Sequence, residues 1–199
     1  LAVAAAFAEA DPGATALVCC AELCSLHYHF GDRVDQMISN ALFADGAGAA
    51  VVSARGPEEA PRIAGCASAL FAGTADMMRW RIADHGFEMT LAPEVPAALA
   101  EHVPGWVGAA LDPHELGVRD IGGWAIHPGG PRIVRAIADA LGLRPDQAEP
   151  SLAILRSRGN MSSPTILFIL RELWDGGVAR PWVGVAFGPG LAGELILLR

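Results

Sequence analysis

The sequence predicts an α/β domain in which strands and helices alternate along the chain around one hydrophobic core. Short apolar runs bounded by Gly, Pro and Asp residues are typical of buried strands, and segments with helical spacing separate them. The 199 residues are enough for one sizeable core. Since no period of about 20 to 50 residues recurs and no low-complexity linker divides the chain, we expect a single structural unit.

In the first half of the chain we expect two helices and three strands. The helices cover 1–10 and 35–42, and the strands cover 14–21, 47–54 and 61–71. The first helix is alanine-rich and ends at Asp11-Pro12-Gly13. The first strand is expected to be buried, and the other two are expected to pair with each other in a meander.

In the second half, helices and strands alternate again. The helices are expected at 94–111, 131–141, 146–158 and 163–174, and the strands at 181–187 and 191–198, while 117–126 leads into the central strand and His127. We expect Pro104-Gly105 to interrupt the first of these helices and Gly142 to end the second. The last helix is almost entirely apolar, so it is expected to be buried.

The composition excludes several classes of function. The formal charge is −8 and lysine is absent, which argues against a nucleic-acid surface because phosphate binding needs clustered cations. No apolar run is long enough to span a membrane, and the apolar segment 1–10 lacks the basic start of a signal peptide. Hydrophobic residues make up 52% of the chain, and this excess predicts surfaces that another half or a partner subunit covers.

The chain has four cysteines, Cys19, Cys20, Cys24 and Cys66, all in apolar, strand-like stretches. This placement indicates reduced, buried thiols in a cytoplasmic protein. A zinc site formed by the first three with His27 and His29 is the disfavoured alternative. Structural zinc ligands usually come in pairs on loops, whereas alternate residues of a strand point to opposite faces.

Two polar residues stand out as catalytic candidates. His127 ends an apolar run and precedes Pro128-Gly129-Gly130-Pro131, so it lies where a buried strand stops and a helix begins. Asn160 lies between a helix end at Gly159 and a new helix opened by Ser162 and the residues after it. Each pattern also has a purely structural explanation, a satisfied core histidine or a helix stop. If the two side chains converge, both could donate to one carbonyl oxygen.

Three motifs in order, 127–131, 159–163 and 187–191, resemble the chalcone synthase-like type III polyketide synthases. The resemblance covers essentially the whole chain. It implies the C-terminal half of a thiolase-like α/β fold, a mixed sheet flanked by helices, with the N-terminal half absent. Residues 16–199 would form the C-terminal thiolase-like domain. Residues 1–15 would be the end of the helix that carries the nucleophilic cysteine, together with its turn, so that cysteine is expected upstream of Leu1.

The resemblance implies a decarboxylative Claisen condensation of acyl-CoA with malonyl-CoA. The N–H groups of His127 and Asn160 would stabilise the enolate oxygen, and His127 would also lower the pKa of the missing cysteine. No metal or redox cofactor is expected. We expect the protein to form a homodimer. We expect the 199-residue chain alone to be inactive and not to be acylated.

The resemblance also places nine residues at the substrate cavity or its loops: Cys24, His27, Phe43, Trp80, Met89, Ser162, Gly188, Pro189 and Gly190. Phe43 matches an aromatic gatekeeper between the coenzyme A tunnel and the reaction cavity. Met89 takes the place of a second gatekeeping phenylalanine, and a flexible thioether can yield to a long apolar chain. The alternatives stay open: strand-end positions for Cys24 and His27, core filling for Met89, and helix capping for Ser162.

The region around Trp80, with Asp84-His85-Gly86-Phe87, looks like microbial alkylresorcinol and alkylpyrone synthases and favours fatty acyl starters. Two rival hypotheses remain. One is a ketoacyl-ACP synthase III-like enzyme, which takes substrates from an acyl carrier protein. The other is an inactive fragment that acts only in folding or association.

Overall fold

The protein is described here by a computed structural model that covers residues 1–84 and 86–199. His85, in the segment 84–87 discussed above, lies outside the described residues. A mixed four-stranded sheet with the order β3-β8-β7-β6 lies at the centre. Its strands are β3 (Ile63–Leu70), β6 (Gly123–Ile126), β7 (Trp182–Gly188) and β8 (Ala192–Leu198). The order places β6 at one edge of the sheet, and the β6–β7 pair is the parallel one.

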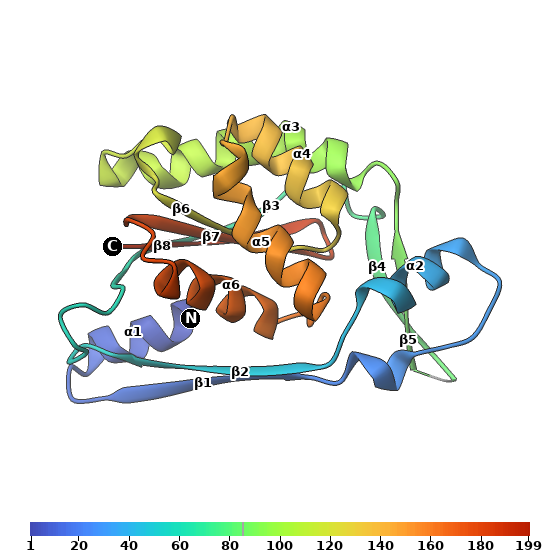
Figure 1. Ribbon diagram of the computed structural model, residues 1–199, viewed down its shortest axis with the longest axis horizontal. Helices are drawn as coiled ribbons and strands as arrows, with labels where there is room; N and C mark the ends of the chain where they lie inside the picture. The colour runs from blue at the N-terminus through green and yellow to red at the C-terminus, as the bar shows by residue number, and fades with distance from the viewer. Residues whose placement is uncertain (85) are drawn as a thin grey trace.

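Helices cover both faces of this sheet (Figure 1). On one side, α3 (Val95–Leu111) packs against β3 and against α4 (Pro131–Leu141). On the other side, α6 (Pro164–Asp175) packs against β6 and β7, with α1 (Ala2–Ala10) beside it. A further helix, α5 (Pro145–Arg158), contacts β6, α4 and α6. Short 3₁₀ helices at Asp112–His114 and Val118–Asp120 lead from α3 into β6.

A second, separate ribbon is formed by β1 (Thr15–Glu22) and β2 (Gly46–Ser53), which pair antiparallel. The predicted meander is therefore wrong, because β3 pairs with β8 and not with β2. The prediction of a buried first strand is also wrong. Residues of β1 alternate between exposed and partly buried, since α1 and α6 cover only the inner face of the ribbon.

The cysteines also differ from the prediction of buried thiols. All four thiols are free, but Cys19 and Cys66 are exposed, and Cys20 and Cys24 are only partly buried. Cys19 belongs to the uncovered face of β1, where Leu17 opposite Val51 is exposed as well. Among the described residues, no group of three His, Cys, Asp or Glu side chains could hold a metal ion.

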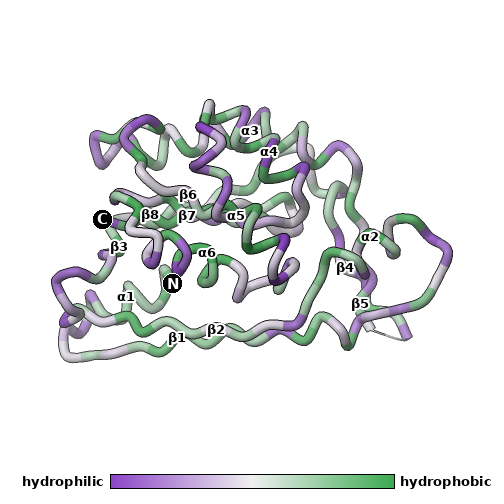
Figure 2. Tube along the Cα trace, in the orientation of Figure 1, coloured by the Kyte–Doolittle hydropathy of each residue, from purple (hydrophilic) through white to green (hydrophobic). Residues whose placement is uncertain are grey.

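One core cluster, which includes Ala125, Ile169 and Leu173, lies between the central sheet and α6, and a larger cluster lies between the sheet and the α3–α4 layer. Trp124 and Ile126 of β6 are fully buried there, and Figure 2 shows the strands of this sheet as predominantly hydrophobic. Helix α3 runs without a break through Pro104, contrary to prediction. Val103 and Val107, on either side of the proline, are both fully buried, and this packing offsets a cost of about 3 kcal/mol for a proline inside a helix.

The last helix is buried only in part. In α6 the residues Pro164, Thr165, Ile169 and Leu173 are buried, whereas Trp174 is exposed. Of the described residues, no helix is both long and apolar enough to cross a membrane.

One end of the molecule is built from four short elements, and they frame the site described below. They are the 3₁₀ helix η1 (Cys24–His27), α2 (Val34–Leu42), β4 (Met78–Ala83) and β5 (Gly86–Leu91). The strands β4 and β5 pair as a hairpin, and both η1 and α2 pack against β5 (Figure 1).

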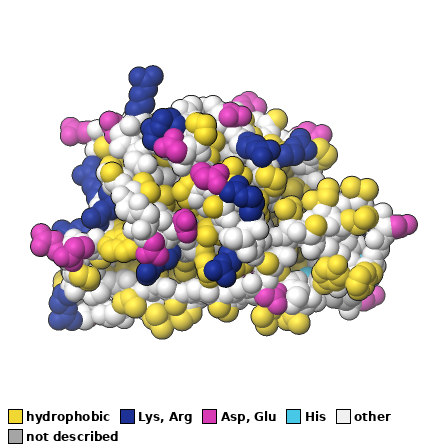
Figure 3. Space-filling view, viewed as in Figure 1, with side chains coloured by type: hydrophobic (Ala, Val, Ile, Leu, Met, Phe, Trp, Pro, Cys, Tyr) yellow, Lys and Arg dark blue, Asp and Glu magenta, His cyan; other side chains and the backbone are white. Residues whose placement is uncertain are grey.

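Large apolar side chains are exposed on several elements, including α1, the segment 23–30, β3 and β4. Two further regions are the outer face of the β1–β2 ribbon and the outward face of α2, where Val34, Met37 and Ile38 are exposed. Hydrophobic side chains gather along these two regions in the space-filling view (Figure 3). The uncovered apolar surface agrees with the expectation from composition.

Candidate active site

His127 follows the buried strand β6 directly. Its backbone N–H donates to the carbonyl of Val185 at 2.8 Å, which extends the β6–β7 pairing by one residue. Pro131 then begins α4 after the two glycines. Proline has no backbone N–H, and none is needed at this first position, where an N–H would have no partner within the helix. The histidine side chain therefore lies at the carboxyl end of a parallel strand, a common place for ligand sites in α/β sheets.

Asn160 follows the end of α5, and its backbone is held from outside the helix. Its N–H donates to the carbonyl of Leu42 at 2.7 Å, and its own carbonyl accepts from the N–H of Ala44 at 2.9 Å. These bonds form a parallel bridge between Phe43 and Asn160. Only 3% of Asn160 is exposed. The backbone therefore fixes Asn160 next to the predicted gatekeeper.

The amide group of Asn160 has a defined orientation. Its Oδ1 accepts a hydrogen bond from the backbone N–H of Ser162 at 2.9 Å, and only the oxygen end of the amide can accept this bond. Ser162 has φ 60°, a left-handed conformation that is uncommon for a residue with a side chain. Within the described residues, Nδ2 of Asn160 has no hydrogen-bond partner. The amide N–H is therefore available to a ligand.

The catalytic candidates open into one pocket of about 190 Å³. Its walls carry six of the nine residues that the resemblance assigned to the cavity or its loops: Phe43, Trp80, Met89, Ser162, Gly188 and Pro189. The structure thus brings His127 and Asn160 to the same space from two different turns, as the sequence analysis required. As far as the described residues go, Gly190 lines neither this pocket nor the larger one beside it.

Burial lowers the pKa of the His127 imidazole to about 4. The ring is therefore neutral at pH 7, with one nitrogen as an N–H donor and the other as an acceptor. A neutral imidazole can donate to a carbonyl oxygen or accept a proton from a thiol. The cause is desolvation, so an anion placed beside the ring would raise the pKa again.

The lowered pKa of His127 predicts how stability depends on pH. The unfolded chain binds a proton near pH 6.5 and the folded chain only near pH 4, so stability is complete above about pH 7 and falls as the pH drops. We expect the free energy of unfolding to fall by about 2 kcal/mol between pH 8 and pH 5 on account of this residue. Urea unfolding of the wild type and of His127→Gln at both pH values measures it. Equal losses in the two proteins would contradict the assignment.

A larger cavity of about 730 Å³ adjoins the first. Four side chains line both spaces and so form the boundary between them: Phe43, Trp80, Met89 and Ser162. The rings of Phe43 and Trp80 meet edge to face with centroids 6.0 Å apart, and Trp80 contacts Phe87 in the same way at 6.3 Å. Aromatic side chains and one thioether thus separate the pair of donors from the larger cavity.

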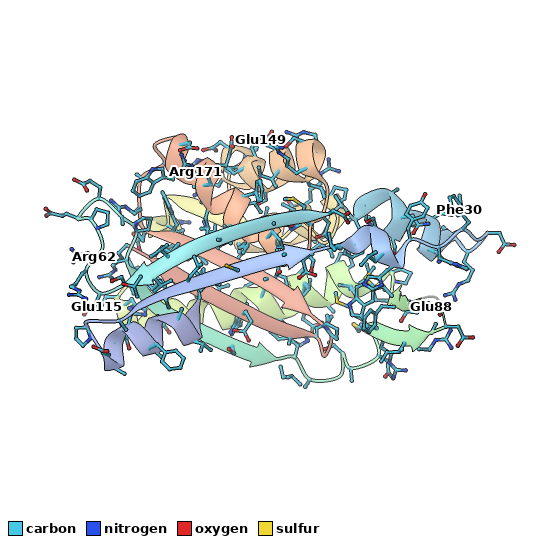
Figure 4. The ribbon with its side chains drawn as sticks, turned by 90° about the horizontal axis from the view of Figure 1, so that it is seen from below. Phe30, Arg62, Glu88, Glu115, Glu149 and Arg171 are labelled. Atoms are coloured by element: carbon cyan, nitrogen blue, oxygen red, sulfur yellow. The ribbon has the colours of Figure 1, made fainter. Side chains whose placement is uncertain are left out.

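Cys24 and His27 line the larger cavity, away from the catalytic candidates. The Nδ1 of His27 accepts from the backbone N–H of Phe87 at 3.4 Å, and the two rings lie 5.0 Å apart. Burial raises the pKa of the Cys24 thiol, and the carboxylates of Glu22 and Asp45 raise it further. Cys24 is therefore a neutral thiol and a poor nucleophile. Figure 4 shows Phe30 and Glu88 at this same end of the molecule.

Two contacts of this cavity escaped the sequence analysis. Asp45, interpreted only as part of a turn, accepts hydrogen bonds from the backbone N–H and the hydroxyl of Ser25 at 2.7 and 2.6 Å. These bonds hold the pKa of Asp45 below its usual value. Glu22 accepts from the hydroxyl of Ser163 at 2.6 Å, a residue 141 positions away. No local pattern signals either contact, because each one joins distant parts of the chain.

Comparison with known proteins decides the family. Residues 63–199 match the family model of chalcone and stilbene synthases, C-terminal domain. The chain belongs to the chalcone and stilbene synthase family. Residues 1–72 of this family member match a second model, that of 3-oxoacyl-[acyl-carrier-protein] synthase III. The family predicted from the three motifs is thereby confirmed.

Relatives of known name resemble the chain along nearly its whole length. The 3,5-dihydroxyphenylacetyl-CoA synthase of Streptomyces toyocaensis is 33% identical over 99% of this chain and 53% of the relative. The 1,3,6,8-tetrahydroxynaphthalene synthase of Streptomyces peucetius subsp. caesius is 34% identical over 94% and 52%. The crystal structure of PKS-I from the brown alga Ectocarpus siliculosus matches with a TM-score of 0.95 and 32% identity, over 100% and 56%.

This chalcone and stilbene synthase family member therefore spans just over half the length of the relatives it matches. The predicted fold class is confirmed, since the mixed sheet flanked by helices corresponds to the C-terminal part of thiolase-like type III polyketide synthases. The family consists of acyltransferase-type enzymes that act on coenzyme A thioesters.

Proposed function

We propose that the chain is part of a type III polyketide synthase that condenses an acyl-CoA starter with malonyl-CoA by decarboxylative Claisen condensation. The observation that carries the proposal is the shared pocket of His127 and Asn160, with the amide N–H of Asn160 directed by Ser162. The family relationship supports the same reaction. No cofactor takes part in the proposed reaction, because loss of carbon dioxide drives carbon–carbon bond formation.

The proposed first step is decarboxylation of malonyl-CoA. The bond between the carboxylate and the α-carbon breaks, carbon dioxide leaves, and the electron pair moves into an enolate with negative charge on the thioester oxygen. The N–H groups of His127 and Asn160 donate to that oxygen. Because the charge develops as the bond breaks, donors already aimed there stabilise the transition state more than the ground state.

The proposed second step is condensation. The enolate carbon attacks the acyl thioester carbonyl, a new carbon–carbon bond forms, and the thiolate of a cysteine leaves. We expect this cysteine in the part of the protein that precedes Leu1. In its free thiol form it would give its proton to neutral His127. The resulting thiolate would then attack the carbonyl of the next acyl-CoA, so that a new cysteine thioester forms and the coenzyme A thiolate leaves.

The starter is proposed to be a long aliphatic acyl group. Three of the four boundary side chains, Phe43, Trp80 and Met89, are large and apolar, and Met89 is the most adaptable of them. A thioether at this boundary can turn aside for an extended chain where a phenyl ring would block it. The adjoining cavity of about 730 Å³ would take up the growing product.

The starter hypothesis gives a testable ranking. We expect full-length protein to use long aliphatic acyl-CoA starters faster than p-coumaroyl-CoA, compared by kcat/KM in the presence of malonyl-CoA. Met89→Phe should lower kcat/KM for the longest starters by about tenfold and leave short ones nearly unchanged. Ile82→Phe, at an exposed position of β4 that lines neither cavity, is the control. A preference for the aromatic starter in the wild type would refute the hypothesis.

A second candidate function has one observation in its favour, the match of residues 1–72 to 3-oxoacyl-[acyl-carrier-protein] synthase III. Such an enzyme would use the same pair of donors but take malonyl groups from an acyl carrier protein. Assays of full-length protein with malonyl-CoA and with malonyl carrier protein separate the two. Faster turnover of the carrier-bound substrate would favour the second candidate.

The oligomeric state of the protein is also part of the proposed function. We expect a homodimer, and the exposed apolar faces of α2 and of the β1–β2 ribbon are consistent with surfaces that are covered in the complete protein. Light scattering on full-length protein measures the mass. The cytoplasmic location expected from the cysteine usage stays a prediction.

A further inference from the structure

Strand β6 is an edge strand, yet its outer side is not left open. The helix α5 packs against it and forms hydrogen bonds on both sides of its length. Two residues before β6 begins, Nε2 of Gln147 donates to the carbonyl of Ile121 at 3.0 Å. At the last residue of β6, the hydroxyl oxygen of Ser151 accepts from the backbone N–H of Ile126 at 2.9 Å. Ser151 is fully buried and Gln147 nearly so.

The bond from Ile126 to Ser151 lies immediately before His127. The next backbone N–H, that of His127, donates to Val185 of β7 on the opposite side. Two successive amides are thus tied to two different elements, α5 and β7. The carboxyl end of β6 is therefore fixed from both sides, and with it the point at which the histidine side chain leaves the strand.

The same helix also delivers Asn160. From Ser151 to the last residue of α5, Arg158, the helix rises about 10 Å. Gly159 follows, and then Asn160, whose backbone is held by Leu42 and Ala44. A helix of this length is stiff, and α5 also packs against α6, which begins just after Asn160 (Figure 1; Glu149 and Arg171 mark the two helices in Figure 4). One rigid element thus spans from the strand end that carries His127 to the turn that carries Asn160.

We propose that Ser151 is a positioning residue, which sets His127 at the distance and angle from Asn160 that the enolate oxygen requires. The kinetic test of this inference rests on the proposed function, whereas the test by deuterium exchange does not. Ser151 does not line either pocket among the described residues and acts only through the backbone of Ile126. Without its hydroxyl, the N–H of Ile126 has no acceptor in a site closed to water, so the strand end must shift to find one.

A small shift has a large expected effect on rate. Displacement of a catalytic group by about 1 Å can lower the rate 10²-fold, because both donors must meet one oxygen. We expect Ser151→Ala to lower kcat for malonyl-CoA decarboxylation by about 10- to 100-fold with little change in KM. The amide of Ile126 should exchange with deuterium about tenfold faster, which corresponds to the loss of one hydrogen bond.

Gln147→Met is the matched control. It removes a buried hydrogen bond from the same helix to the segment just before β6, at Ile121, six residues before His127, together with the bond that Oε1 of Gln147 accepts from the backbone N–H of Arg144. We expect it to lower the melting temperature about as much as Ser151→Ala does and to leave kcat near the wild-type value. If Ser151→Ala does not fold, Ser151→Cys replaces it. A thiol is a weaker acceptor, so an intermediate loss of kcat is expected.

Each outcome is decisive. Wild-type full-length protein that fails to decarboxylate malonyl-CoA would overturn the proposed function, while faster exchange at Ile126 in Ser151→Ala alone would still support the positioning role. An active wild type with Ser151→Ala equally active, or with Gln147→Met equally impaired, would overturn the positioning role alone. Selective loss of kcat in the Ser151 variants supports it.

Discussion

Replacement of Asn160 by aspartate should lower malonyl-CoA decarboxylation by the full-length protein by about 10²–10³-fold. The change is nearly isosteric. One carboxylate oxygen can still accept from the N–H of Ser162, as Oδ1 does now, so the backbone of the turn should remain. The other oxygen replaces the free N–H and places negative charge where the enolate charge develops. The loss should therefore appear in the chemical step, which release of carbon dioxide from malonyl-CoA measures directly.

Two comparisons make the Asn160 test specific. Thermal unfolding should show Asn160→Asp within a few degrees of the wild type, because the hydrogen bonds of its backbone to Leu42 and Ala44 are unaffected. Ser157→Ala, near the end of α5, removes only local bonds to the carbonyls of Ala153 and Ile154 and should keep full activity. Wild-type decarboxylation by the aspartate variant would show that this amide is not a donor in the reaction.

Replacement of Gly159 by alanine is expected to lower the free energy of unfolding by about 2–4 kcal/mol. Gly159 has φ 76° and ψ −173°, a combination essentially restricted to glycine. An added Cβ would also lie 2.9 Å from the Cβ of Ala44 and 3.2 Å from the carbonyl oxygen of Leu42. These are the residues that hold the backbone of Asn160, so the turn must move and activity should fall with stability.

Gly142 provides the matched comparison, because it ends α4 as Gly159 ends α5. Its φ of 66° and ψ of 34° lie in the left-handed helical region, which asparagine tolerates, and nothing lies within 4 Å of an added Cβ. We expect Gly142→Asn to change the free energy of unfolding by less than about 1 kcal/mol. Urea unfolding of full-length variants measures both. A similar small effect at the two glycines would contradict the close packing of the 159–160 turn against 42–44.

The two turns that carry the proposed donors could be predicted because their signals are local. His127 is followed by two glycines and a proline, and Asn160 is preceded by a glycine, so each turn is readable from a few neighbouring residues. The helix ends at Ala10 and Leu141 are local in the same sense. Pro104 shows the limit of such reasoning. Its local preference is to break α3, but burial of Val103 and Val107 on the sheet outweighs that preference.

The sequence alone determined most of the order of strands and helices and the two turns that carry His127 and Asn160. These follow from hydrophobic periodicity and turn chemistry, which act over a few residues, whereas the family followed from the resemblance of three short motifs. The strands β4 and β5 were not predicted. Only the tertiary structure decided that β3 pairs with β8, that Cys19 is exposed, and that Ser151 reaches Ile126. Strand pairing, burial and side-chain contacts of this kind depend on which distant surfaces meet, and no short pattern encodes that meeting.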